Sequence, residues 1–125
     1  MAPTPRAGVS SVVTQARPAE LVGDPFLDSQ RAMEHLELGE VERALALATR
    51  SAQAVPRAAS GWWAQRHCAL AAGRFAEARE AMERLAGELG VPLAEVESGD
   101  DLDAFRASPE GAAWEAWKAR RAAAR

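Results

Sequence analysis

Two glycines lie 34 residues apart and give the middle of the chain an internal repeat. Gly39 and Gly73 each stand between two stretches whose apolar residues recur at steps of three and four, the spacing of one helix face. Residues 38–44 and 72–78 match each other at this offset. A period of this length, joining paired amphipathic stretches, predicts a repeated helix–turn–helix unit.

Helical patterns continue along most of the chain after residue 24. We expect helices over about residues 26–38, 40–55, 62–72 and 75–89, and a final one from about residue 109. Asp24 and Ser108 each precede a proline, and both pairs are typical helix starts, because the side-chain oxygen caps free N–H groups and proline fits the first turn. Abundant Ala, Leu, Glu and Arg favour an all-α fold.

The sequence predicts a division of the chain into three segments. Residues 1–23 contain three prolines among small and polar residues and are expected to be a disordered or loosely held arm. Residues 24–92 form the repeat domain, with repeats at 25–58 and 59–92. Residues 93–125 combine a solvated acidic connector with a C-terminal helix. Two repeats leave one end open, so we expect this helix to cap the repeat core through four large residues: Leu102, Phe105, Trp114 and Trp117.

Particular residues at fixed places in each repeat make the chain resemble the tetratricopeptide repeat (TPR) family. The family favours a Trp early in the first helix, a Gly between the helices, an apolar and then a small residue after it, and a Pro at the end. This sequence supplies Gly39, Val41, Ala44 and Pro56 in one unit and Trp62, Gly73, Phe75 and Ala78 in the next. The acidic connector and final helix also loosely resemble the ending of many bacterial repeat proteins. The resemblance implies two antiparallel hairpins whose first helices line a concave face.

Candidate partner-binding residues follow from that implied concave face. They are Met33, Leu36, Glu37, Trp63, His67 and Leu70. Trp63 and Met33 would be apolar anchors, since aromatic residues dominate binding hot spots and Met adapts to several shapes. Glu37 and His67 would recognise polar groups of the bound partner, whereas Trp62 is expected in the core. The alternative is that Trp63 is itself a core residue, covered by the C-terminal helix lying in the groove.

Composition and motifs argue against several other classes of protein. A formal net charge of −3 argues against a nucleic-acid binder. No apolar run approaches the roughly 20 residues that span a bilayer, so we expect no membrane insertion. The lone Cys68, beside His67, has no second Cys or His at ligand spacing, and we expect no metal, cofactor or catalytic residue. The absence of an apolar leader favours a cytoplasmic protein.

The function expected from these features is protein–protein binding. The chain would be an adaptor, scaffold or assembly factor that docks a peptide or helix of another protein on its concave face. A self-associating subunit of a homo-oligomer or larger assembly is the alternative, because the exposed end of a short hairpin stack invites pairing with another copy.

Overall fold

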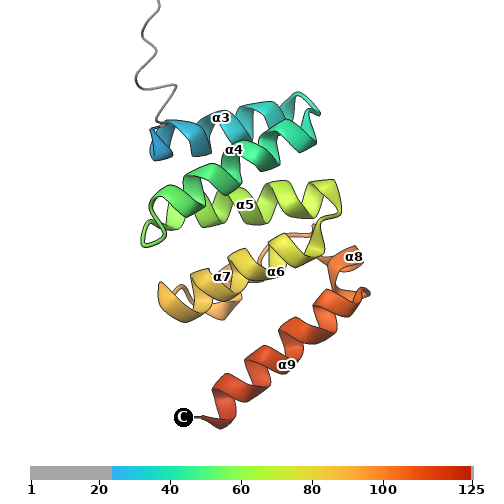
Figure 1. Ribbon diagram of the computed structural model, residues 1–125. Helices are drawn as coiled ribbons and strands as arrows, with labels where there is room; N and C mark the ends of the chain where they lie inside the picture. The colour runs from blue at the N-terminus through green and yellow to red at the C-terminus, as the bar shows by residue number, and fades with distance from the viewer. Residues whose placement is uncertain (1–23, 125) are drawn as a thin grey trace, which may run out of the picture.

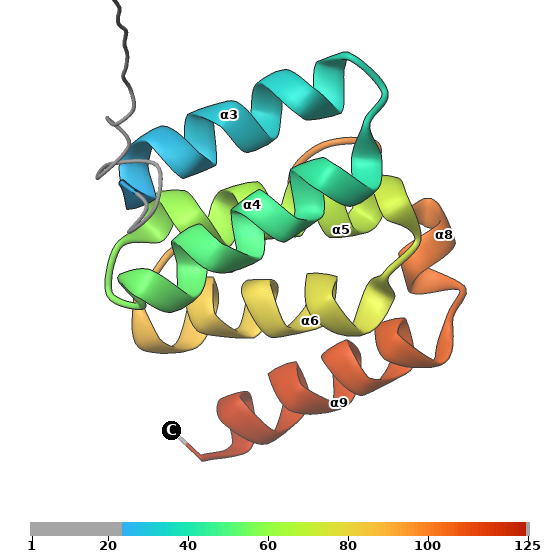
Figure 2. The same cartoon turned by 45° about the horizontal axis from the view of Figure 1, so that its top comes forward.

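The computed structural model describes residues 24–124, and all regular structure in that range is helical. The elements in chain order are α3 (Pro25–Glu37), α4 (Val41–Ala54), α5 (Ala59–Ala72), α6 (Phe75–Glu83), the π-helical turn η1 (Arg84–Glu88), α7 (Leu93–Val96), α8 (Asp103–Arg106) and α9 (Pro109–Ala123). Successive helices from α3 to α6 run back and forth, and α9 lies beside α6 (Figures 1 and 2). The all-α prediction is confirmed. The predicted arm at residues 1–23 lies outside the described residues.

Local sequence signals account for most helix ends. The Asp24 carboxylate accepts hydrogen bonds from two backbone N–H groups in the first turn of α3, and Ser108 Oγ accepts one, at 3.2 Å, in the first turn of α9. Gly39 and Gly73 have φ of 82° and 72°, a left-handed conformation that glycine adopts without a Cβ clash. The predicted helix starts at Asp24 and Ser108 and the glycine turns are therefore confirmed.

The start of α5 differs from the prediction. The helix begins at Ala59 rather than near residue 62, so Gly61 lies within its first turn and does not precede it. A Cβ on Gly61 would stand 2.6 Å from the Cα of Ala52, which means that the backbones of α4 and α5 touch there. Gly61 is thus a packing residue, and its role depends on a contact that the local sequence does not contain.

The fourth predicted helix also changes form before it ends. It is α-helical to Glu83 and then widens into η1, where the N–H of Leu89 donates to the carbonyl of Arg84 at 3.1 Å. Gly87 in this turn faces α9, and a Cβ there would lie 3.1 Å from Cζ2 of Trp117. The wide turn and the missing side chain therefore coincide with the place where α9 approaches.

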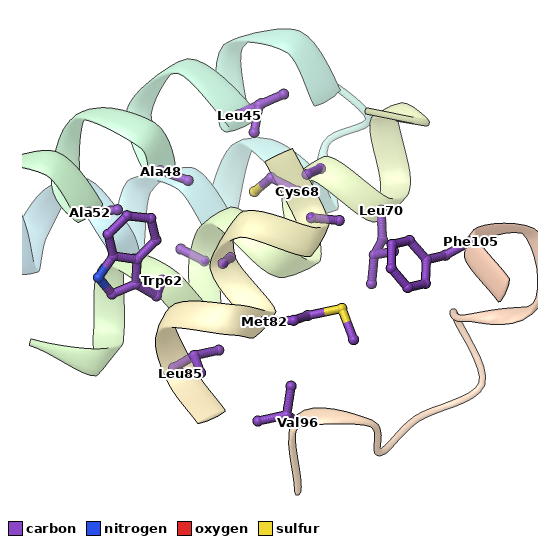
Figure 3. Packing of buried hydrophobic residues seen from close by; sticks show 14 of the residues in the cluster. Leu45, Ala48, Ala52, Trp62, Cys68, Leu70, Met82, Leu85, Val96 and Phe105 are labelled. Atoms are coloured by element: carbon purple, nitrogen blue, oxygen red, sulfur yellow. The ribbon is translucent and has the colours of Figure 1, made fainter. Parts of the chain in front are cut away.

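Small residues let the four long helices pack closely. Ala44, Ala48 and Ala52 on α4 and Ala78 and Ala81 on α6 have no exposed surface. Larger side chains fill the space between them, and Figure 3 shows Trp62, Cys68, Met82 and Leu85 in one continuous cluster. Trp62 is buried as predicted, and its indole N–H donates to the carbonyl of Pro56 at 2.8 Å.

Polar contacts join the first two helices at their outer ends. Asp28 is buried and accepts two hydrogen bonds from the guanidinium of Arg50, at 2.9 and 3.0 Å. Beside them, the Ser51 hydroxyl donates to the carbonyl of Pro25 at 2.5 Å. Charge-assisted bidentate pairs fix geometry strongly, so this contact sets how α3 lies against α4.

The C-terminal segment covers the end of the second hairpin. Leu102, Phe105 and Trp114 are buried in the same cluster as the repeat helices, and Trp117 packs against that cluster while partly exposed. The ring of Phe105 meets that of Phe75 edge to face, with centroids 5.8 Å apart. The large residues near the C-terminus thus extend the core of the repeats.

The connector between α6 and α9 has exposed acidic side chains, as expected, at Glu95, Asp100, Asp101 and Asp103, but its backbone is fixed to the domain. Arg66 on α5 is wholly buried and donates from Nε to the carbonyl of Val96 at 2.8 Å and from Nη2 to that of Ser98 at 2.9 Å. Glu97 accepts from the Trp114 indole at 2.8 Å and from Lys118 Nζ at 2.6 Å. A buried cation therefore holds the connector backbone, and a connector carboxylate holds α9.

Candidate partner-binding groove

A groove runs between α3 and α5, the first helices of the two hairpins. We call it the α3–α5 groove; its volume is about 530 Å³, within the range of roughly 300–1,000 Å³ typical of binding pockets. It is lined by Ser29, Gln30, Met33 and Glu34 from α3 and by Ser60, Trp63, Ala64 and His67 from α5. It is open to solvent along its length, a shape that suits an extended or helical segment better than an enclosed small molecule.

The α5 wall carries an aromatic pair. Trp63 and His67 are one turn apart, and their rings stack with centroids 5.9 Å apart and planes inclined by 21°. The guanidinium carbon of Arg66 lies 5.8 Å from the Trp63 ring centroid, and its Nη1 lies 3.2 Å from Nδ1 of His67, so the indole, the imidazole and the guanidinium form one contact cluster. Trp63 packs partly against the core and lines the groove with the rest of its surface.

Three of the six predicted binding residues line the α3–α5 groove, namely Met33, Trp63 and His67. The other three do not line it, and Leu70 does not lie on the open surface. Leu70 is only 8% exposed and lies near Phe105 in the core cluster (Figure 3). Leu36 packs partly buried against the core, and Glu37 is exposed one turn beyond the groove lining. The binding face implied by the family resemblance therefore extends about one helical turn beyond the open groove on each helix.

Five of the lining residues were not among the predicted ones, namely Ser29, Gln30, Glu34, Ser60 and Ala64. Helical spacing offered a signal for them. Gln30 is three residues before Met33, and Ser60 is three residues before Trp63, so each shares a face with a predicted anchor. Their small or polar side chains gave no chemical reason to select them.

The C-terminal helix does not fill the α3–α5 groove. α9 packs against α6 and α8, and none of the groove-lining residues belongs to it. Figures 1 and 2 both show α9 beyond α6, on the side away from α3. The sequence left open whether α9 covers Trp63, and in the structure α9 lies away from Trp63.

The histidine and cysteine on α5 lie in environments that do not favour catalysis. Burial lowers the pKa of His67, the charge of Arg66 lowers it further, and Asp101, 3.8 Å from Nδ1, opposes both. Burial raises the pKa of the Cys68 thiol to about 11, so it is protonated and a poor nucleophile near neutral pH. Among residues 24–124, no group of three or more His, Cys, Asp or Glu side chains could hold a metal ion.

No helix within the described range is long and apolar enough to cross a membrane. Comparison with known proteins adds no assignment: no family model, no curated protein and no solved structure matches this chain.

Proposed function

We propose that this chain is a small protein–protein interaction module, built as a short TPR-like array, that binds a peptide or helix of another protein in the α3–α5 groove. The observation that carries the proposal is an open groove with two large apolar side chains, Met33 and Trp63, on facing helices. Binding hot spots are enriched in tryptophan and lie where a partner can exclude water. Polar groups from Gln30, Glu34 and His67 surround these anchors and would orient the bound segment.

The first test compares partner capture by two folded variants. Met33→Ala combined with Trp63→Ala removes both anchors from the groove. Leu38→Ala is the matched control, because Leu38 is a large apolar residue that is 73% exposed and lies outside the groove. Each tagged protein would be incubated with lysate of the source cell, and the bound proteins would be identified by mass spectrometry.

We expect the control to retain the partners of the wild type and the double variant to lose them. Far-UV circular dichroism and thermal melting must show that both variants remain folded. Retention of the same partners by the folded double variant would refute binding in the α3–α5 groove. If the double variant unfolds, Glu34→Arg, on an exposed groove residue, tests the same surface without removing packed side chains.

A self-associating subunit is the second candidate, and the outer turn of α3 favours it. Phe26 and Leu27 are 60% and 40% exposed, and together they form an apolar pair at the first-hairpin end of the stack. Exposed neighbouring apolar side chains of this size often belong to an interface. Light scattering across a concentration series tests this: a homo-oligomer that dissociates on Phe26→Ser would support self-association, and a monomer at all concentrations would refute it.

A further inference from the structure

The electrostatic character of the α3–α5 groove points to the chemistry of its occupant. Glu34 is exposed in the groove wall and is the carboxylate among the lining residues. Glu37 is four residues after Met33, so it extends the same face of α3 by one turn, and it is also exposed. The α3 wall therefore presents two carboxylates beside its apolar anchor.

The α5 wall adds no free positive charge to balance them. The Arg66 side chain has no exposed surface, and its Nη1 lies 3.4 Å from the carboxylate of Asp101, which is 41% exposed and lies 3.8 Å from Nδ1 of the groove residue His67. Asp100 beside it is exposed as well. Because the Arg66 charge is buried and partly compensated, this part of the surface presents carboxylates to solvent and not a cation.

The remaining ionisable groups near the groove do not change the negative charge of its walls. His67 is mainly neutral near pH 7, because burial and the charge of Arg66 lower its pKa more than Asp101 raises it. Arg31 is exposed on α3 three residues before Glu34 and can offset part of its charge, but it does not line the groove, and the exposed carboxylates of Glu34, Glu37 and Asp101 outnumber it. The cations Lys118, Arg120 and Arg121 belong to α9, which does not line the groove.

We propose that the occupant of the α3–α5 groove is a segment of a partner protein in which a lysine or arginine lies next to a bulky apolar side chain. The apolar side chain lies between Met33 and Trp63, and the cation faces Glu34 and Glu37. This inference rests on the proposed function and adds the charge and composition of the partner. Complementary charge steers encounter and excludes acidic segments, whereas the buried apolar contact supplies most of the affinity.

The test uses a phage-displayed library of random dodecapeptides as the probe. The full chain is panned against this library, with counter-selection on the Trp63→Ala variant to remove peptides that bind elsewhere. We expect the enriched peptides to combine Lys or Arg with Leu, Met, Phe or Trp within one or two positions. Enrichment of acidic or uncharged peptides would overturn the inference while leaving the groove as a peptide site.

The dependence on the two carboxylates is then measured with the most enriched peptide, labelled for fluorescence anisotropy. Exposed ion pairs contribute about 0.2–1 kcal/mol each, so Glu34→Gln with Glu37→Gln should weaken binding roughly two- to thirtyfold at low salt. Glu88→Gln with Glu115→Gln, two exposed carboxylates on η1 and α9, makes the same change in net charge away from the groove and should change the Kd little. Raising the salt concentration should weaken wild-type binding and leave the groove double variant less affected.

Equal Kd values for the wild type and the Glu34→Gln, Glu37→Gln variant would also overturn the inference. If panning yields no peptide that distinguishes the wild type from Trp63→Ala, the proposed function fails together with it. A peptide lost with Trp63→Ala but indifferent to the carboxylates keeps the proposed function and rejects only the basic partner.

Discussion

Replacing the buried Arg66 with methionine tests whether one side chain holds the connector to the repeats. The guanidinium donates to the carbonyl oxygens of Val96 and Ser98 at 2.8 and 2.9 Å, and its Nη1 has two longer contacts, to His67 Nδ1 at 3.2 Å and to Asp101 at 3.4 Å. Hydrogen bonds to charged groups contribute about 1.5–3 kcal/mol each, so losing the two short ones costs about 3–6 kcal/mol. Methionine also removes the desolvation cost of a buried cation, which is several kcal/mol.

Methionine also leaves the carbonyl groups of Val96 and Ser98 without a donor, so a net loss remains, and Arg66→Met is predicted to lower the free energy of unfolding by about 2–4 kcal/mol. Asp101→Asn is the matched variant, because it keeps both carbonyl contacts and removes only the half-exposed carboxylate that faces Arg66 and His67. Such half-exposed ion pairs contribute about 1 kcal/mol or less. Urea unfolding followed by circular dichroism measures both variants, and hydrogen exchange should show faster exchange of the amide groups of residues 93–101 in Arg66→Met.

Two results would refute this reasoning. An Arg66→Met protein as stable as the wild type would mean that desolvation of the guanidinium offsets everything its hydrogen bonds contribute. A loss of stability in Asp101→Asn equal to that in Arg66→Met would mean that the ion pair, and not the two carbonyl contacts, holds the connector.

Three further predictions concern α5. Gly61→Ala should lower stability by about 2 kcal/mol, measured by urea unfolding, because the clash with the Ala52 backbone outweighs the roughly 1 kcal/mol gained in helix propensity; a stabilised variant would contradict the close packing. Burial, and then the charge of Arg66, lower the pKa of His67, so the stability contributed by its neutral imidazole is complete above about pH 6.5 and is lost as the pH falls below that value. The wild type should therefore lose more stability than His67→Gln between pH 7 and 5, measured by denaturant titration. Parallel stability curves for the two proteins would refute this. Cys68, with a pKa of about 11 and no exposed surface, should react with a thiol reagent at pH 8 only as fast as the protein unfolds, and fast labelling of the native protein would show that the site is open.

Much of the fold follows from short-range features of the chain. The glycine turns at Gly39 and Gly73, the caps at Asp24 and Ser108 and the burial of Trp62 were all predicted correctly. The burial of Trp62 was implied by the resemblance to the repeat family. The turns and caps instead depend on residues within a turn or two of themselves: a left-handed φ, or a side-chain oxygen beside free N–H groups. Such interactions are present in the sequence whatever the rest of the chain does.

The candidate site was only partly predictable for the same reason. Met33, Trp63 and His67 were selected by residue type and helical spacing, and they do line one groove. Leu70 has the same kind of signal but is buried, because the segment that covers it near Phe105 comes from 35 residues later in the chain. Periodicity identifies the faces of a helix, but it does not say which face meets a neighbour.

Tertiary structure alone decided the rest. The sequence around Arg66 gives no sign that its side chain is buried, because the carbonyl groups that accept its hydrogen bonds belong to Val96 and Ser98, 30 and 32 residues away. The sequence alone indicates a helix breaker at Gly61, whereas the structure shows that its missing side chain lets the backbone of Ala52 approach. The open groove exists because α9 packs on α6 instead of over Trp63. Local propensity determined where the helices lie in the sequence, whereas contacts between distant segments determined which surface remained free to bind.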